Sequence, residues 1–280
     1  MKTVVIIGVG LIGGSMGIAL KEKKIVSRVI GVDASSAHSA QALELGIVDE
    51  IMDLEEAVLQ ADLIVLAVPV DIAEKLLVQI MPLVKKQVIM DVGSTKTAVC
   101  NIASSFPNSG RFVATHPMWG TEFSGPAAAV KTAFAGKAVV ICNKEKADTD
   151  ALLMVEEIYR KLEMRLLYMK ADAHDIHAAY VSHISHITSF ALANTVLEKE
   201  KEDDAIFELA SAGFESTVRL AKSNPEMWVP IFMQNKENVL DVLNEHISQL
   251  RKFKACLEKD NVEYLGALIQ HANTIKRILK

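Results

Sequence analysis

The sequence has few cysteines and no block of like charge. Its 280 residues include three cysteines, Cys100, Cys142 and Cys256, which lie far apart and show no CxxC spacing. The odd count and wide spacing argue against a disulfide framework and a zinc knuckle, and favour reduced, buried thiols. The net charge is −5, with both signs dispersed, which argues against nucleic acid or an acidic membrane surface as the main partner. Small molecules are therefore the expected ligands, and no metal site is expected.

The chain also lacks a long apolar run. No stretch of membrane-spanning length is free of charged residues. The first residues form a strand-like run and show neither a basic region nor a cleavage site of the secretory kind. We therefore expect a cytoplasmic protein without a membrane partner. Half of the residues are hydrophobic, enough for two modest domains with cores of their own.

The first part of the sequence alternates short β-branched runs with helical patterns, which predicts a parallel sheet with helices on both faces. After Met169 the strand signal stops, and the rest of the chain has the pattern of consecutive helices, with breaks near Gly213 and at "SNPEMW". We predict an α/β domain over residues 1–170 and an all-α domain over residues 171–280. The strand-like runs are "TVVIIG", "RVIGVD", "DLIVLAVP", "QVIMDVG", "RFVATHP", "KAVVICN" and "MRLLYM".

A glycine-rich turn follows the first predicted strand. In "IIGVGLIGGSMGIAL", Gly8, Gly10 and Gly13 stand between an apolar strand and an amphipathic helix, with Leu11 and Ile12 among them. Three glycines permit a tight turn, close approach of the backbone to a pyrophosphate and close packing of helix on strand, while the helix N-terminus adds partial positive charge. A glycine turn without a ligand is the alternative. The strand-turn-helix context favours dinucleotide binding by these five residues.

Asp33 ends the second predicted strand, twenty residues after Gly13. A carboxylate at this place can accept hydrogen bonds from the adenosine ribose hydroxyls, and it would repel a 2′-phosphate. An aspartate that only begins the next helix is the alternative, and Ser35 or Ser36 could cap that helix equally well. Because both its position and the strand end fit, we expect NAD as cofactor rather than NADP.

Two further strand ends should face the same crevice, because ligands of open parallel sheets bind beyond the carboxyl ends of the strands. One carries Val68 and Pro69 in "LAVPV", and the other carries Asp91, Ser94 and Lys96 in "DVGSTK". We expect Val68, Pro69 and Asp91 to line the cofactor site. For Ser94 and Lys96, helix capping and a solvated first turn are the alternatives.

His116 ends the next strand, in "VATHPMWGTEFSG", and Pro117 after it fixes the turn. A lone histidine is more often structural than catalytic. This one shares a strand-end surface with Ser94 and the expected nicotinamide. A dehydrogenase that oxidises an alcohol needs a base of near-neutral pKa to take the hydroxyl proton, and an imidazole supplies it. We expect His116 to be that base.

Together, "GVGLIGGS", "DVGSTK", "THPMWGTEFSG", "SHISH" and "GFESTVRLAKSNPEMW" resemble the prephenate and arogenate dehydrogenase family of tyrosine biosynthesis. The resemblance extends from residue 1 to about residue 270 and includes the spacing between motifs. It implies a Rossmann domain followed by a helical domain that forms an intertwined homodimer. It also implies oxidative decarboxylation of prephenate with NAD(P).

The resemblance also assigns roles to residues of the α/β part. His116 matches the catalytic histidine, which bonds and deprotonates the ring hydroxyl of the substrate. Ser94 matches the serine that holds this hydroxyl and the imidazole. Thr121 matches a position at the wall of the substrate pocket. Aromatisation of the ring supplies the driving force, so the protein mainly has to orient two partners and accept a proton.

A long predicted helix, "ADAHDIHAAYVSHISHITSFAL", should begin the second domain with Asp172 as its cap. Helical spacing places Asp175, Ser182 and His186 on one stripe, with His183 at its flank. The resemblance makes His183 and His186 substrate-binding residues. Histidines that face a subunit core are the alternative, and no third ligand supports a metal site. The family's usual "SHLPH" has proline where this chain has serine, which could straighten the helix.

Arg219, in "STVRLAK", matches an arginine that binds a substrate carboxylate, for which a planar guanidinium is suited. A surface arginine is the alternative. Trp228 matches a position near the pocket, or it packs a domain interface. Arg219 and a second donor at His186 suit the two carboxylates of prephenate, whereas an acidic group such as Asp175 could instead favour the ammonium of arogenate.

Two other functions are open to this architecture. A β-hydroxyacid dehydrogenase would carry a catalytic lysine on the long helix, but no lysine occurs between Lys170 and Lys199. A protein that senses dinucleotides without catalysis could keep the fold alone. The joint presence of Ser94, His116 and Arg219 favours a catalyst, and NAD-dependent dehydrogenation of prephenate is the predicted activity.

Overall fold

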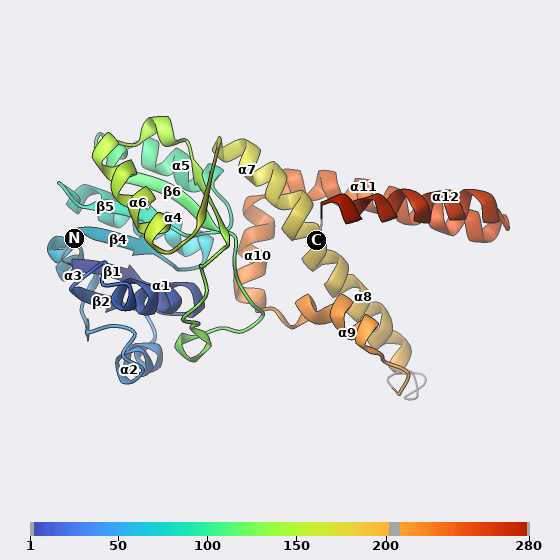
Figure 1. Cartoon of the computed structure of the whole chain (residues 1–280), viewed down its shortest axis with the longest axis horizontal. Helices are drawn as coiled ribbons and strands as arrows, with labels where there is room; N and C mark the ends of the chain where they lie inside the picture. Colours follow the sequence, from blue (N-terminus) through green and yellow to red (C-terminus); the bar gives the residue numbers. More distant parts are fainter. Residues whose placement is uncertain (1–2, 202–207, 279–280) are drawn as a thin grey trace. The chain divides into compact units, whose positions relative to one another are not determined.

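A computed structural model describes residues 3–201 and 208–278. These residues divide into two compact units, one that ends at Asn235 and one that begins at Lys236. The first unit contains the sheet and helices α1 to α10, and the second contains α11 and α12 (Figure 1).

An eight-stranded sheet forms the framework of the first unit, in the order β3-β2-β1-β4-β5-β6-β7-β8. Neighbouring strands are parallel except for the antiparallel pair β6 and β7. The strands are β1 (Thr3–Ile7), β2 (Arg28–Val32), β3 (Glu50–Ile51), β4 (Leu63–Leu66), β5 (Val88–Asp91), β6 (Phe112–Pro117), β7 (Ala138–Cys142) and β8 (Arg165–Met169).

The sheet differs from the sequence prediction in two ways. The short strand β3 was not predicted, because two residues are too few to show an alternating pattern. Strands β7 and β8 run against the other strands. A parallel partner for β6 would need a crossover helix, and the segment between β6 and β7 holds only the short 3-10 turn Pro126–Ala128. The chain therefore returns along the sheet in the opposite direction.

Helices cover both faces of the sheet, because alternate strand residues point to opposite sides. Val4 and Ile6 of β1 belong to a buried cluster with residues of α1, α2 and α6, whereas Val5 and Ile7 belong to a cluster with residues of α3, α4 and α5. These helices are α1 (Leu11–Glu22), α2 (Ser36–Glu44), α3 (Leu54–Gln60), α4 (Val70–Ile80), α5 (Thr97–Ser104) and α6 (Thr149–Lys161).

The helical part of the first unit follows β8. Asp172 was predicted to cap the first helix, but the cap position is Lys170 and Asp172 lies in the first turn. The π turn Ala179–His183 lies between α7 and α8 without a break in the chain of helical residues. The three elements form one long helix with a local irregularity at the π turn. The elements are α7 (Ala171–Ala178), α8 (Ile184–Glu200), α9 (Ala212–Val218), the 3-10 turn η7 (Arg219–Lys222) and α10 (Pro225–Gln234).

The second unit is a helical hairpin. Its helices are α11 (Lys236–Glu258) and α12 (Val262–Ala272), followed by a 3-10 turn, η8 (Asn273–Arg277). Asp260 takes a positive φ of 49° in the connection, and the side chain of Asn261 caps α12 by accepting from the Tyr264 N–H at 3.0 Å.

The predicted fold class, an α/β part with a mostly parallel sheet followed by an all-helical part, is confirmed. The change from strand to helix falls between Met169 and Ala171, and we keep a domain boundary near residue 170 as a proposal. Within the two described stretches, no helix is both long and apolar enough to cross a membrane.

Candidate active site

The glycine turn joins β1 to α1 at the carboxyl edge of the sheet. Gly8 has a φ of +92°, which side-chain-bearing residues rarely adopt. A Cβ on Gly13 would lie 2.0 Å from the Gly8 carbonyl oxygen, whereas a Cβ on Gly10 would meet nothing within 4 Å. The glycines thus give tight helix-strand packing and an open approach to the N-terminus of α1, which begins at Leu11 and Ile12 without a side-chain cap.

Asp33 follows β2 beside this turn. Its carboxylate accepts from the backbone N–H of Val9 at 3.0 Å and of Ser35 at 2.9 Å. Ser35 in turn caps α2, because its hydroxyl accepts from the His38 N–H at 3.2 Å. The carboxylate therefore links the glycine turn to the end of β2, where the sequence predicts the adenosine ribose.

Asp91 lies in a buried polar network below the strand ends. Its carboxylate pairs with the fully buried Lys96 ammonium and accepts from the Thr115 N–H at 3.1 Å. Lys96 also donates to the Thr115 carbonyl at 2.7 Å. Asp91 and Lys96 thus connect the end of β5 to β6. Lys96 is buried, so the solvated first turn considered as its alternative environment is not what the structure has. Val68 is half-buried and Pro69 is exposed at the end of β4.

His116 lies near the end of β6, next to β5, whose following loop carries the half-buried Ser94. The Nδ1 atom of His116 is 2.8 Å from Nε2 of His174, and Nδ1 of His174 is 2.8 Å from the Asp175 carboxylate. Burial, followed by the nearby charges of His174, Lys96 and His183, holds the pKa of His116 well below its usual range. His116 is therefore neutral at pH 7.

The Asp175 carboxylate is held by the start of α5. One oxygen accepts from the Lys96 N–H and the other from the Thr97 N–H, both at 2.8 Å. Burial alone would raise the pKa of Asp175, but hydrogen bonds from His174, Thr97 and Lys96 outweigh it and lower the pKa. Asp175 is therefore an ionised anchor between α5 and α7.

His183 is buried at the end of the π turn. Its Nδ1 atom lies 3.2 Å from the side-chain nitrogen of Asn235, which also donates to the Asp175 carbonyl at 2.7 Å. Because an amide nitrogen only donates, Nε2 of His183 carries the proton. Nε2 is buried and has no hydrogen-bond partner among the residues that the structure describes. Burial lowers the pKa of His183 to about 4, so a neutral N–H donor is available there.

The π turn changes the predicted helix stripe. A π turn has more residues per turn than an α-helix. The residues after it therefore point in other directions around the helix axis than a continuous α-helix would give them. As a result, His183 shares the buried face with Asp175, while Ser182 and His186 are only partly buried. The burial of these residues therefore differs from that expected of a single stripe of Asp175, Ser182 and His186.

His186 stacks on Trp228, with ring centroids 3.4 Å apart and planes 26° apart. Its Nδ1 is 3.1 Å from the Ser182 carbonyl oxygen, to which it donates. Burial lowers the pKa of His186, and the charge of Arg219 adds to this. His186 is thus neutral, with the lone pair on Nε2. Trp228 is buried and also contacts His183 edge to face, so it packs both histidines.

Arg219 begins η7 and donates to the Glu122 carboxylate at 2.9 Å. Glu122 belongs to the loop after β6, in which the Thr121 hydroxyl accepts from the Phe123 N–H at 3.3 Å. The Arg219 side chain is half exposed. The ion pair therefore connects the loop after His116 to the helical residues.

Trp228 joins two of the candidate residues, because its ring contacts His183 edge to face and stacks on His186. The sequence interpretation missed His174, Asn235 and Glu122. Only the adjacency of His174 to Asp175 could have drawn attention to the first of them.

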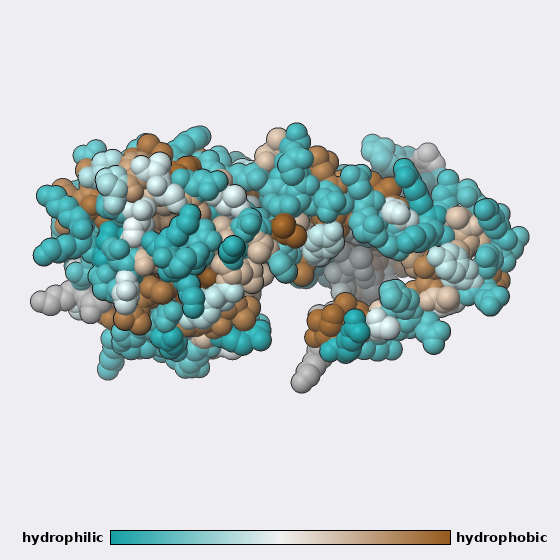
Figure 2. All heavy atoms as spheres, turned by 90° about the horizontal axis from the view of Figure 1, so that it is seen from above, coloured by the Kyte–Doolittle hydropathy of each residue, from teal (hydrophilic) through white to brown (hydrophobic). Residues whose placement is uncertain are grey.

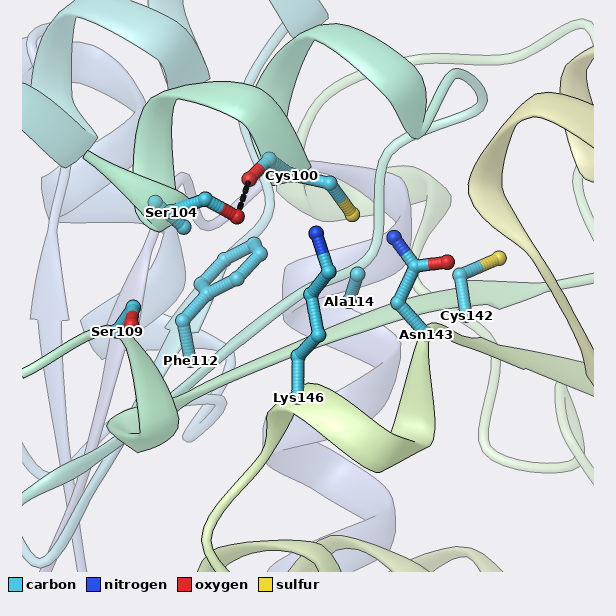
Figure 3. A pocket seen from close by; sticks show the side chains of 9 residues that line it. Cys100, Ser104, Ser109, Phe112, Ala114, Cys142, Asn143 and Lys146 are labelled. Carbon is cyan, nitrogen blue, oxygen red and sulfur yellow. Dashed lines mark hydrogen bonds between the residues drawn. The ribbon is translucent and has the colours of Figure 1, made fainter. Parts of the chain in front are cut away.

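A separate small cavity lies between α5 and β6 (Figure 3). It is lined by Cys100 and Cys142, together with Phe112 and Lys146, and by none of the candidate catalytic or substrate-binding residues. Burial raises the pKa of Cys100 to about 12 and raises that of Cys142 as well. Both thiols stay protonated, as expected of packing residues rather than nucleophiles.

Among the described residues, no group of three or more His, Cys, Asp or Glu side chains could hold a metal ion. The site is instead a glycine turn for a nucleotide, a neutral histidine at the same sheet edge, and further histidines and an arginine from the helical part. These features are typical of a dinucleotide-dependent dehydrogenase.

Residues 16–168 match the nucleotide-binding domain of prephenate dehydrogenase, and residues 170–271 match its dimerisation domain. The chain therefore belongs to the prephenate dehydrogenase family. It is 31% identical over 270 residues to prephenate dehydrogenase of Bacillus subtilis. The alignment covers 94% of this chain and 72% of that protein.

Solved structures agree with the family. Prephenate dehydrogenase of A. aeolicus, in complex with hydroxyphenyl propionate and NAD+, superposes with a TM-score of 0.91 at 27% identity over 100% of this chain and 99% of that one. Arogenate dehydrogenase of Synechocystis superposes with a TM-score of 0.79 at 26% identity over all of both chains. Relatives of comparable similarity thus differ in the substrate after which they are named.

Proposed function

We propose that this protein catalyses the NAD-dependent oxidative decarboxylation of prephenate to 4-hydroxyphenylpyruvate. The observation that carries the proposal is the neutral His116, which lies at the same edge of the sheet as the glycine turn and is hydrogen-bonded to His174 of α7. The family membership and the relatives named above support the same reaction.

The residues present fit a dinucleotide. The space in front of Gly10 and the uncapped N-terminus of α1 suit a pyrophosphate. Asp33 suits a ribose with free hydroxyls and opposes a 2′-phosphate, which supports NAD over NADP. Gly8, Leu11, Ile12, Gly13, Val68 and Pro69 complete the proposed site. We assign Asp91 a supporting role, because its carboxylate is buried in the pair with Lys96. When bound, NAD accepts the hydride from the hydroxyl-bearing ring carbon.

The chain's own residues handle the proton. Nε2 of neutral His116 accepts the proton of the ring hydroxyl, and Ser94 holds that hydroxyl next to the imidazole. Loss of the ring carboxylate as carbon dioxide then leaves an aromatic ring. A base that is already neutral at pH 7 needs no prior deprotonation, so positioning is the main demand on the protein.

Two groups support recognition of an acidic substrate. Arg219 offers a guanidinium for a carboxylate, although Glu122 engages it in the unliganded chain. His183 offers a buried N–H on Nε2 whose desolvation a substrate oxygen would compensate. Thr121 is proposed to lie at the pocket wall.

Arogenate is the second candidate substrate, and His186 is the observation that favours it. Neutral His186 donates through Nδ1 to Ser182, which leaves an acceptor at Nε2. An acceptor suits the ammonium of arogenate, whereas a carboxylate of prephenate would first require protonation of His186. Asp175, in contrast, does not favour arogenate, because its oxygens already accept from α5 and His174.

The test measures the rise of nicotinamide absorbance with prephenate and with arogenate, each with NAD and with NADP. We expect the highest kcat/KM with prephenate and NAD. Higher efficiency with arogenate would overturn the substrate assignment, and equal turnover with NADP would overturn the role of Asp33. No turnover with either substrate would support a binding protein without catalysis.

We also propose a homodimer formed through the helical part, because the matching family domain is a dimerisation domain. We propose the cytoplasm as the compartment, because all three cysteines are free thiols, as a reducing environment keeps them.

A further inference from the structure

We propose that His174 and Asp175 form a relay that holds His116 in the one tautomer able to act as a base. The inference rests on the proposed role of His116, and it assigns two positioning residues that do not touch the substrate. Three side chains from two elements form an unbroken line of hydrogen bonds, His116 to His174 and His174 to Asp175, each 2.8 Å long.

The direction of these hydrogen bonds follows from the carboxylate. An ionised aspartate only accepts, so Nδ1 of His174 must carry a proton and donate it to Asp175. A His174 ring that carries this proton alone has its lone pair on Nε2, which then accepts from Nδ1–H of His116. His116 is thereby left with its lone pair on Nε2, the nitrogen that the line of hydrogen bonds does not use.

Asp175 is built to stay ionised. It is 4% exposed, and the N–H groups of Lys96 and Thr97 at the start of α5 donate to its two oxygens. These donors, and the partial positive charge of a helix N-terminus, favour the carboxylate over the acid. They also fix its orientation, because each oxygen is bonded to a different backbone group.

The other charged groups near His116 oppose its protonation. After burial, the charges of His174, Lys96 and His183 lower its pKa, in that order, and the Lys96 charge is paired with Asp91. When Nε2 takes the hydroxyl proton, the new positive charge must therefore be stabilised locally. The relay does this, because Nδ1–H of His116 points through His174 to a negative charge. No proton has to reach Asp175.

The first experiment determines the tautomer of His116 in the absence of substrate. Long-range 15N–1H correlation spectra of histidine-labelled protein distinguish protonated from unprotonated ring nitrogens, and His116→Asn identifies the signals of His116. We expect the Nδ1–H form in the wild-type protein. His174→Phe should give a mixture of tautomers, because it removes both relay nitrogens at similar volume. His177→Phe, at an exposed position of the same helix, is the control and should leave the tautomer unchanged.

The second experiment measures turnover. His174→Phe and Asp175→Asn should lower kcat by about 10- to 100-fold with little change in KM, because part of the acid-base contribution is lost. Asp175→Asn should also move the acid limb of the kcat profile to lower pH, since the imidazolium loses its stabilising carboxylate. His174→Phe is not used for this test, because it also removes the charge of His174, which lowers the pKa of His116. His177→Phe should keep the wild-type profile.

The outcomes separate the relay from the proposed function. An unchanged His116 tautomer in His174→Phe together with an unchanged pH profile in Asp175→Asn would refute the relay, whatever the substrate is. A tautomer shift in His174→Phe, with a wild-type protein that turns over neither prephenate nor arogenate, would keep the relay and refute the proposed function. A folded variant with raised KM and unchanged kcat would assign the pair to substrate binding instead.

Discussion

His116 differs from an ordinary histidine in that its surroundings keep it neutral without a nearby acidic group in direct contact. Burial and the charges of His174, Lys96 and His183 all act in the same direction. Replacement by Asn keeps a hydrogen-bonding side chain but removes the basic nitrogen. We expect His116→Asn to lower kcat by about 10²–10⁴, with the NAD dissociation constant nearly unchanged. Steady-state kinetics and NAD titration measure both, and a wild-type kcat would remove His116 from the mechanism.

Arg219 is half exposed and paired with Glu122, so its contribution depends on how far substrate binding desolvates it. Surface pairs contribute little and buried carboxylate pairs much more. We expect Arg219→Ala to lower kcat/KM about 10- to 100-fold, mostly through KM. Lys222→Ala, on the same turn, is the control and should have a minor effect. Equal effects of the two variants would indicate that only general positive charge matters.

His186 makes the pH dependence diagnostic of the substrate. Its pKa is lowered in the unliganded chain, and a bound carboxylate would raise it, since protonation then gains a partner. Binding through His186 would be strongest at low pH and lost as the pH rises through the pKa of the complex. We expect KM for prephenate to rise between about pH 5 and 8, and His186→Ala to flatten this rise. An identical slope in the variant would show that another group titrates.

At the scale of elements, close packing at the glycine turn is the feature most open to test. A methyl group at Gly13 would lie 2.0 Å from the Gly8 oxygen, whereas one at Gly10 would meet no atom within 4 Å. We expect Gly13→Ala to lower the free energy of unfolding by about 1–3 kcal/mol and to weaken NAD binding. Gly10→Ala should leave the free energy of unfolding nearly unchanged. Chemical denaturation of both variants decides this, and equal stabilities would contradict the packing role of Gly13.

The helices and strands also show which features could be predicted from the sequence and which could not. The glycine turn and the order of buried runs predicted the α/β part, because periodicity and strand ends are local properties. The direction of β7 was not accessible, since a strand has the same pattern in either direction. His174 was missed for a related reason: its role depends on contact with a strand 58 positions earlier in the chain. The π turn, which places His183 beside Asp175, left no recognised signal in the sequence either.

At the scale of the whole molecule, exposed apolar side chains support self-association. Figure 2 shows apolar residues as brown patches among hydrophilic ones. In the helical hairpin, Leu250 is 55% exposed, Leu257 67% and Ile269 50%. Such surfaces on a matched dimerisation domain favour a partner copy.

We expect sedimentation at twice the chain mass of 30.6 kDa. Ile269→Asp should shift the equilibrium towards the monomer, because it would bury a charge at the interface. Gln270→Asp adds the same charge one position away and serves as the control. A monomeric wild-type protein at micromolar concentration would contradict the dimer.

The bond between His116 and His174 also has a consequence for biosynthesis. A ribosome completes β6 and the nucleotide-binding turn before α7 exists, and the hydrogen-bond partner of His116 arrives only when α7 docks beside α5 and β7. Until then the imidazole has no fixed tautomer. On the proposed roles, the unfinished chain can bind a dinucleotide before His116 has the tautomer of a base. The order of synthesis then makes catalytic competence a late step.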